Sequence, residues 1–164
     1  IDIAKRYYHE SMEIAKQDGN AISVIICLAG FALCEVMAKS SEAKTYLRES
    51  IQMSQQIHFY EALAWSMEIW ALVSINEGRY VHAVTLMGAV DHLRETTQLP
   101  VWDDLHAIIL DANVQLHKLL GDDAFTHAWD QGVNMSFERM LEYAMEEGVE
   151  EMKTGLVEQS QLLL

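Results

Sequence analysis

The chain has 164 residues, of which 51% are hydrophobic, and it carries a formal net charge of −14 at pH 7. This hydrophobic content excludes a disordered chain, and one proline with eight glycines leaves little turn chemistry for an all-β fold. The negative charge, with no basic cluster to offset it, is unfavourable for contact with a phosphate backbone. We therefore expect one all-α domain that makes no direct contact with nucleic acid.

The first third of the chain alternates between amphipathic and apolar helical patterns. Residues 2–17 predict an amphipathic helix, and residues 18–20 predict a turn. An apolar helix is expected over residues 21–37, and the amphipathic pattern returns over residues 42–57. The longest apolar run, residues 22–34, is too short to cross a bilayer, so we expect no membrane partner.

The stretch from residue 58 to residue 95 predicts two helices joined by a short turn at residues 77–79. The first helix is apolar almost all the way round, so it must be covered on two sides. The second carries one apolar stripe, with Leu86, Met87 and Val90 following Ala83 at helical spacing. Such a hairpin cannot bury itself alone and implies stacked neighbours.

These segments repeat with a period of about 40 residues. The sequences AKRYYHESMEIAK from Ala4 and AKTYLRESIQMSQ from Ala43 match with an offset of 39, as do Ala32 and Ala71. Ala83 follows Ala43 by 40 residues. A repeated helix–turn–helix of this length is the signature of an α-solenoid, and small residues at Ala71 and Ala83 let the paired helices approach closely.

Pro100 interrupts the repeat, and a different set of helices is expected after it. Residues 101–120 carry a long apolar face, with acidic residues in the first turn and basic residues in the last. Asp122 or Asp123 is expected to cap a short helix, and Ser136 to cap the final one.

The pattern therefore divides the chain into three parts. We expect residues 1–100 to form about two and a half helix pairs, a count that follows from the repeat period. Residues 101–147 are expected to close the end of the solenoid as a helical cap of the same domain. Residues 148–164 are expected to be either a linker toward a further domain or a helix docked on the solenoid.

A resemblance appears at NEGRYVHAV, which looks like the turn of a tetratricopeptide repeat. Gly78, Tyr80 and Ala83 stand at the glycine, aromatic and small positions of that family, and Ala71 matches its small residue in the first helix. The period exceeds the usual length of about 34 residues, and the typical proline after the second helix is missing. The resemblance is to a longer-period variety.

A second resemblance covers residues 82–145. HAVTLMGAVDHLRE, which contains Gly88, and LGDDAFTHAWDQGVNMSFERMLEYAM are similar to the end of the helical repeat region in large bacterial signal-transduction ATPases. These include LuxR-type (MalT-like) and AfsR-like transcriptional regulators. The specific part is the spacing of Gly121, Phe125, Trp129, Gly132 and Ser136. The resemblance implies a sensor or interaction arm beside a nucleotide-binding switch, although this chain contains no GxxxxGK[ST] phosphate loop.

Metal and cofactor chemistry have little support in the sequence. Asp103 and His106 could face one ion, but the chain contains no Glu-x-x-His, HxxxH or CxxC, so no metal and no cofactor is expected. Asp103 is more simply a residue that favours the first turn of a helix.

Catalytic chemistry has equally little support, and we expect the chain not to be an enzyme. Cys27 and Cys34 lie in the most apolar predicted helix, where burial should raise the pKa of a thiol, and they suggest a reducing, cytoplasmic compartment. No glycine-flanked serine elbow occurs. An acidic run (Glu146, Glu147, Glu150 and Glu151) is expected to be a solvated helix end.

The surface expected to bind a partner is the groove lined by the first helices of each pair. The repeat pattern points one row of side chains toward the concave side: Trp65, Glu68, Leu72, Ile75 and Asn76. A peptide or a neighbouring domain could lie there, anchored by Trp65 and hydrogen-bonded by Asn76. The competing interpretation is that Trp65 packs on the preceding repeat.

These observations favour a non-catalytic interaction or sensor region of a bacterial multidomain regulator, located in the cytoplasm. Its partner would be a protein or peptide, or other domains of its own chain, and exposed solenoid surfaces could also support a homo-oligomer. The alternative is a free-standing adaptor that binds peptide segments. A third interpretation is a helical enzyme with a metal or cofactor in the bundle.

Overall fold

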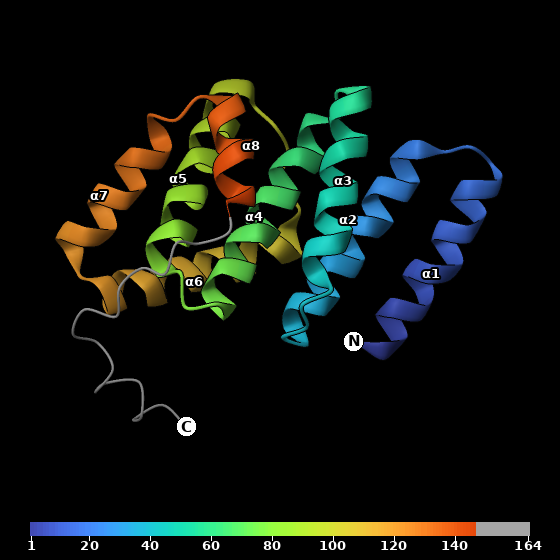
Figure 1. Ribbon diagram of the computed structural model, residues 1–164, viewed down its shortest axis with the longest axis horizontal. Helices are drawn as coiled ribbons and strands as arrows, with labels where there is room; N and C mark the ends of the chain where they lie inside the picture. Colours follow the sequence, from blue (N-terminus) through green and yellow to red (C-terminus); the bar gives the residue numbers. More distant parts are fainter. Residues whose placement is uncertain (147–164) are drawn as a thin grey trace.

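The computed structural model describes residues 1–146, and within that range the fold is all-α, with no strand. The helices are α1 (Asp2–Gln17), α2 (Ala21–Met37), α3 (Ala43–Ile57), α4 (Tyr60–Asn76), α5 (Tyr80–Thr97), α6 (Asp103–Leu120), α7 (Asp122–Val133) and α8 (Phe137–Met145). Helix α1 lies at one end of the molecule and α7 at the other (Figure 1). The helices expected from the sequence are all present, and the limits predicted for those before Gly121 differ from the structure by no more than two residues.

The helices stack as a right-to-left series in Figure 1, which is the arrangement of a helical solenoid. Each of α1 to α5 packs against the next helix along the chain, and α2 also packs against α4. The last three helices break this order. Helix α7 packs extensively on α5, α6 lies across one side of α4 and α5, and α8 rests on the same two helices.

Of the two side-chain caps expected from the sequence, only the one on α8 is present, and α2 has a side-chain cap that was not predicted. The Asn20 side chain accepts a hydrogen bond from the backbone N–H of Ser23 at the start of α2 (3.1 Å), and Ser136 accepts one from Arg139 at the start of α8 (3.2 Å). The prediction for α7 was wrong. Its N-cap is Gly121, while both aspartates that follow lie in the first turn, where their charge still favours the helix dipole.

Most of the turns between helices contain a residue with a positive φ angle. A positive φ is readily adopted by glycine, because glycine has no Cβ, but costs energy for other L-residues. Three turns use glycine and three use a larger residue: Gly19 (φ 65°), Gly78 (76°), Gly121 (78°), Lys39 (54°), His58 (57°) and Gln98 (57°).

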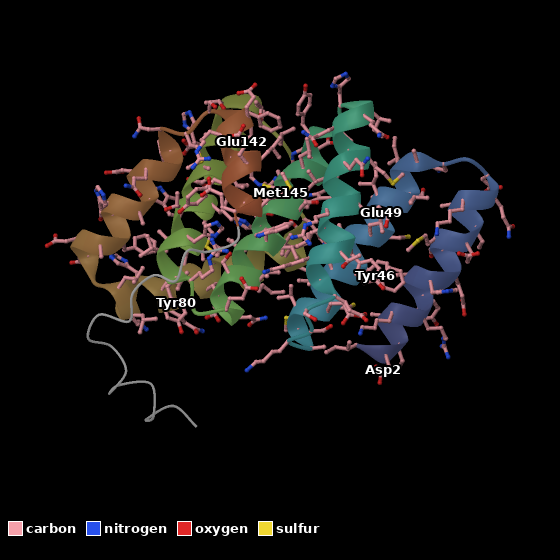
Figure 2. All side chains as sticks on the ribbon, in the orientation of Figure 1. Asp2, Tyr46, Glu49, Tyr80, Glu142 and Met145 are labelled. Carbon is pink, nitrogen blue, oxygen red and sulfur yellow. The ribbon has the colours of Figure 1, made fainter. Side chains whose placement is uncertain are left out.

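The buried apolar side chains fall into two clusters. The main core joins helices α2 to α8 and includes Trp70 together with Ala71 and Ala83, both of which are fully buried. Tyr80, at the first turn of α5, is half-buried against this core. A much smaller cluster holds α1 on α2, and Tyr46, labelled in Figure 2, lies at the boundary of the two clusters.

Glycine is required where α7 meets α5. A Cβ on Gly132 would lie 2.0 Å from the backbone oxygen of Thr85, and a Cβ on Gly88 would lie 2.5 Å from that of Trp129. The two backbones therefore touch directly, which no larger residue permits. These are two of the residues that the second resemblance singled out.

Aromatic stacking covers the end of the cap. The Phe125 ring stacks on Trp129 with centroids 5.8 Å apart, and His117 of α6 stacks on the other side of Phe125 at 4.5 Å. Phe125 and Trp129 also pack on the main core, so the row links α6 and α7 to the rest of the molecule.

Candidate functional site

The five residues expected in a partner groove all lie on the side of α4 that α6 approaches, but the structure does not leave them equally open. Trp65 is half-buried between two aromatic side chains. Its ring meets Phe59 edge to face at 5.8 Å and Trp102, at the start of α6, at 6.0 Å. Trp65 therefore packs against the cap, whereas the sequence suggested either a partner or the preceding repeat.

Glu68 is the most deeply buried of the five, with 4% of its surface exposed. Arg94 of α5 donates two hydrogen bonds to its carboxylate, from Nε to Oε1 (3.1 Å) and from Nη2 to Oε2 (2.8 Å). The same guanidinium donates to the backbone oxygen of Pro100. Burial raises the pKa of Glu68, and the bonds from Arg94 oppose that rise.

This ion pair has a structural consequence. A forked pair of charge-assisted bonds fixes the geometry of both side chains. Because Arg94 also binds Pro100, in the connection that leads to α6, the pair ties α4 and α5 to the first residues of the cap. Glu68 is committed to this internal contact and presents no carboxylate to a partner.

The other three predicted residues border an open pocket. Leu72, Ile75 and Asn76 line a cavity of about 240 Å³ between the C-terminal ends of α2 and α4 and the middle of α6. The amide of Asn76 donates a hydrogen bond to the backbone oxygen of Val36 (2.9 Å). Val36 lies in the last turn of α2, where carbonyl groups lack a helical partner, so Asn76 caps that helix.

A second row, on α2, was missed by the sequence analysis. With the offset of 39 residues, Ile26, Leu33 and Met37 of α2 correspond to Trp65, Leu72 and Asn76 of α4. Ile26 is 39% exposed and Met37 is 55% exposed, and Met37 also lines the pocket beside Leu72. The repeat could have predicted this row, because subtracting 39 from the residue numbers of the predicted groove on α4 gives positions on α2.

The row on α2 and the pocket together form the candidate interaction surface. We define it as Ile22, Ile26, Leu33 and Met37 of α2 with Leu72, Ile75, Ile108 and Ala112 around the pocket. Its side chains are apolar, while Lys39 and Asp111 stand at the rim of the pocket. An apolar row on one helix, beside a cavity edged with charges, suits the apolar face of another helix or an extended peptide.

His82 is a buried polar residue that was not singled out from the sequence. Its Nε2–H donates to the backbone oxygen of Tyr143 in α8 (2.8 Å), and its Nδ1 lies 2.9 Å from the Ser74 hydroxyl in α4. The imidazole also stacks on the Tyr143 ring, with centroids 4.4 Å apart. Desolvation lowers the pKa of His82 to about 4, so the ring is neutral at pH 7. His82 therefore joins three helices.

The thiols behave as the sequence predicted. Cys27 and Cys34 are free and buried, and burial raises the pKa of each. A raised pKa reduces the thiolate fraction and with it nucleophilicity. The arrangement offers no activated cysteine.

The other sequence candidates occupy ordinary positions. Asp103 lies in the first turn of α6, as expected for a residue that favours the helix dipole. Within residues 1–146, no three His, Cys, Asp or Glu side chains gather as metal ligands would. Glu146 pairs with Arg139 at 2.6 Å, while the rest of the acidic run and residues 148–164 lie outside the described residues.

Comparison with known proteins gives one set of relatives. The chain is 28% identical over 92 residues to proteins of Mycobacterium tuberculosis and Mycobacterium bovis, each named "Putative HTH-type transcriptional regulator". The match covers 54% of this chain and 10% of each relative, so this chain corresponds to a small part of their length. No family model matches the chain, and no solved structure matches it. The likeness is compatible with a regulatory context.

Over the described helices, none is both long and apolar enough to cross a membrane.

Proposed function

We propose that this chain is a non-catalytic interaction or sensor region of a bacterial multidomain transcriptional regulator that acts in the cytoplasm. It binds a protein, a peptide or other domains of its own chain, and the binding biases an attached nucleotide-binding switch. The observation that carries the proposal is the similarity to the mycobacterial proteins, whose names describe HTH-type transcriptional regulators. The resemblance to LuxR-type regulators and to tetratricopeptide repeats supports the same interpretation.

The candidate interaction surface is the part of the chain that we assign to this binding. On α2, Ile22, Ile26 and Met37 are apolar and exposed, whereas Trp65, the equivalent of Ile26 on α4, is covered by internal contacts. An apolar partner segment would remove the α2 side chains from water, which is the usual driving force for such association. The net charge of −14 favours a partner with basic flanks and places DNA contact in other domains of the regulator.

The proposal is tested in the complete regulator with a promoter reporter. Deleting residues 1–145 should alter the response to the inducer while nucleotide binding persists. An unchanged response in the deleted regulator would remove the sensor role. A complete gene that encodes no phosphate-loop domain would instead support the free-standing adaptor.

A variant of two surface residues tests whether the partner binds at the candidate interaction surface. The double substitution Ile26→Glu and Met37→Glu should lower partner binding at least about tenfold, because two charges would have to be desolvated in an apolar contact. Leu110→Glu is the matched control, since Leu110 is also apolar and 53% exposed but lies on α6 outside the surface. Equal binding by the double variant and the control would show that the partner binds elsewhere.

A further inference from the structure

The first helix carries an apolar row that faces away from the rest of the molecule. Ile3, Tyr7 and Ile14 are spaced so that they share one side of α1, and they are 66%, 59% and 60% exposed. The opposite side of α1 packs on α2 through Met12 and Ala15. We call Ile3, Tyr7 and Ile14 the outer row.

The internal repeat shows what such a row packs against. With the offset of 39 residues, Tyr7 corresponds to Tyr46 and Ile14 corresponds to Met53, both in α3. Tyr46 is half-buried, and its ring stacks on Phe31 of α2 with centroids 5.2 Å apart and an interplanar angle of 17°. Met53 packs against the small cluster that contains Phe31. In α3, therefore, the preceding helix covers the positions that are exposed in α1.

We propose that the outer row is the docking face for a helix like α2, supplied by a repeat of the same polypeptide on the N-terminal side of α1. That helix would carry an aromatic residue at the position of Phe31, stacked on Tyr7. We favour a source in the same polypeptide because, within this chain, the short connection at residues 38–42 is enough to bring α2 against the equivalent face of α3. The matched relatives are also far longer than the matched segment. The inference depends on the repeat and not on the function proposed above.

The docking is tested by repeating the first helix pair. Residues 1–41 are duplicated and joined directly to Ile3, because Ile3 corresponds to residue 42, which follows residue 41 in the natural chain. The copied α2 then meets the original α1, and the copied α1 exposes the same row as the natural chain does. The number of exposed apolar rows is therefore unchanged.

The duplicated chain provides its own matched control. Tyr7→Glu in the inner α1 should lower the melting temperature by about 5 °C or more, because the charge would lie in a buried contact. The same substitution in the outer α1, or in the natural chain, should change it by less than about 1 °C. Equal effects at the inner and outer positions would overturn the docking proposal.

The source of the helix is tested separately with Ile14→Cys, since both natural thiols are buried. In residues 1–164 a maleimide should label this cysteine rapidly, and in the protein expressed from the complete gene the rate should fall at least about tenfold. Equal rates would overturn a source in the same polypeptide. So would sedimentation of residues 1–164 as a dimer that Tyr7→Glu dissociates, because a second copy would then cover the row.

Discussion

The two ends of the solenoid are built differently. At the C-terminal end, α6, α7 and α8 cover α4 and α5 through a buried histidine and two touching backbones, and a forked ion pair between α4 and α5 also binds Pro100, in the connection to α6. At the N-terminal end, α1 rests on α2 through a small apolar cluster and one ion pair, Lys5 with Glu35 at 2.6 Å. One end is closed by specific polar contacts, whereas the other offers an apolar surface of the kind that repeats use to stack.

The largest effect is expected at the closed end, from Arg94→Met. Removing Arg94 leaves the Glu68 carboxylate buried without its partner, and we expect a loss of about 4 kcal/mol in the free energy of unfolding, measured by urea denaturation. The double variant Glu68→Leu with Arg94→Met is the control, because replacing both partners removes the buried charge. A single variant as stable as the double variant would contradict this account.

Glycine substitutions compare the two ends at the level of the backbone. Gly132→Ala should cost about 3 kcal/mol, since the added Cβ meets backbone atoms of α5 that cannot move aside. Gly30→Ala at the open end should cost less than about 1 kcal/mol. Its Cβ meets only the ring of Tyr8, which is half-exposed and can turn away, and alanine favours the helix. Similar losses in urea denaturation would show that the ends are equally rigid.

Acid should loosen the closed end through His82. Its pKa falls to about 4 in the folded protein against an ordinary value of 6.5, so the unfolded state binds the proton more readily between these values. The stabilisation from the neutral ring is fully present well above pH 6.5 and is lost as the pH falls toward 4, by about 2.5 kcal/mol at pH 4.5. The comparison is with His82→Gln, which does not titrate there. Parallel stability curves for the two proteins between pH 7 and 4.5 would exclude this role.

The smallest effect is expected for Lys5→Met at the open end. Glu35 holds the pKa of Lys5 above its usual value, and Lys5 lowers that of Glu35, but the Lys5 side chain is 30% exposed, and the buried Glu35 carboxylate keeps its hydrogen bond with Ser40 when Lys5 is removed. Methionine keeps most of the apolar stem on α2. We expect a melting temperature only slightly below that of the natural chain, and a fall as large as that from Arg94→Met would remove the contrast between the ends.

The order and limits of the helices could be predicted from the sequence because they depend on local patterns. Apolar spacing, the cap residue Ser136 and the glycine turns act within a few residues. The N-cap of α7 was predicted wrongly because the sequence does not distinguish an aspartate just before a helix from one inside its first turn. Both favour the same dipole.

The candidate site was less predictable because it depends on how α6 crosses α4. No local pattern gives that crossing, and the contacts that fix it join distant residues. Arg94 reaches Glu68 across 26 positions, and His82 reaches Tyr143 across 61. Trp65 was expected in a partner groove or against the preceding repeat, and no local pattern identified Trp102 as its neighbour. The row on α2 could have been predicted from the repeat, since the offset of 39 residues relates Ile26 to Trp65.

Three of the turns contain a non-glycine residue with a positive φ angle, and this strain lowers the free energy of unfolding. Lys39, His58 and Gln98 have positive φ angles like those of Gly19 and Gly78, at a cost of about 1 kcal/mol per residue. Glycine at these three positions would relieve that strain, although a more flexible unfolded chain would offset part of the gain. Because His58 and Gln98 lie outside both the helices and the candidate interaction surface, glycine at these two turns could change the stability of the solenoid without altering that surface.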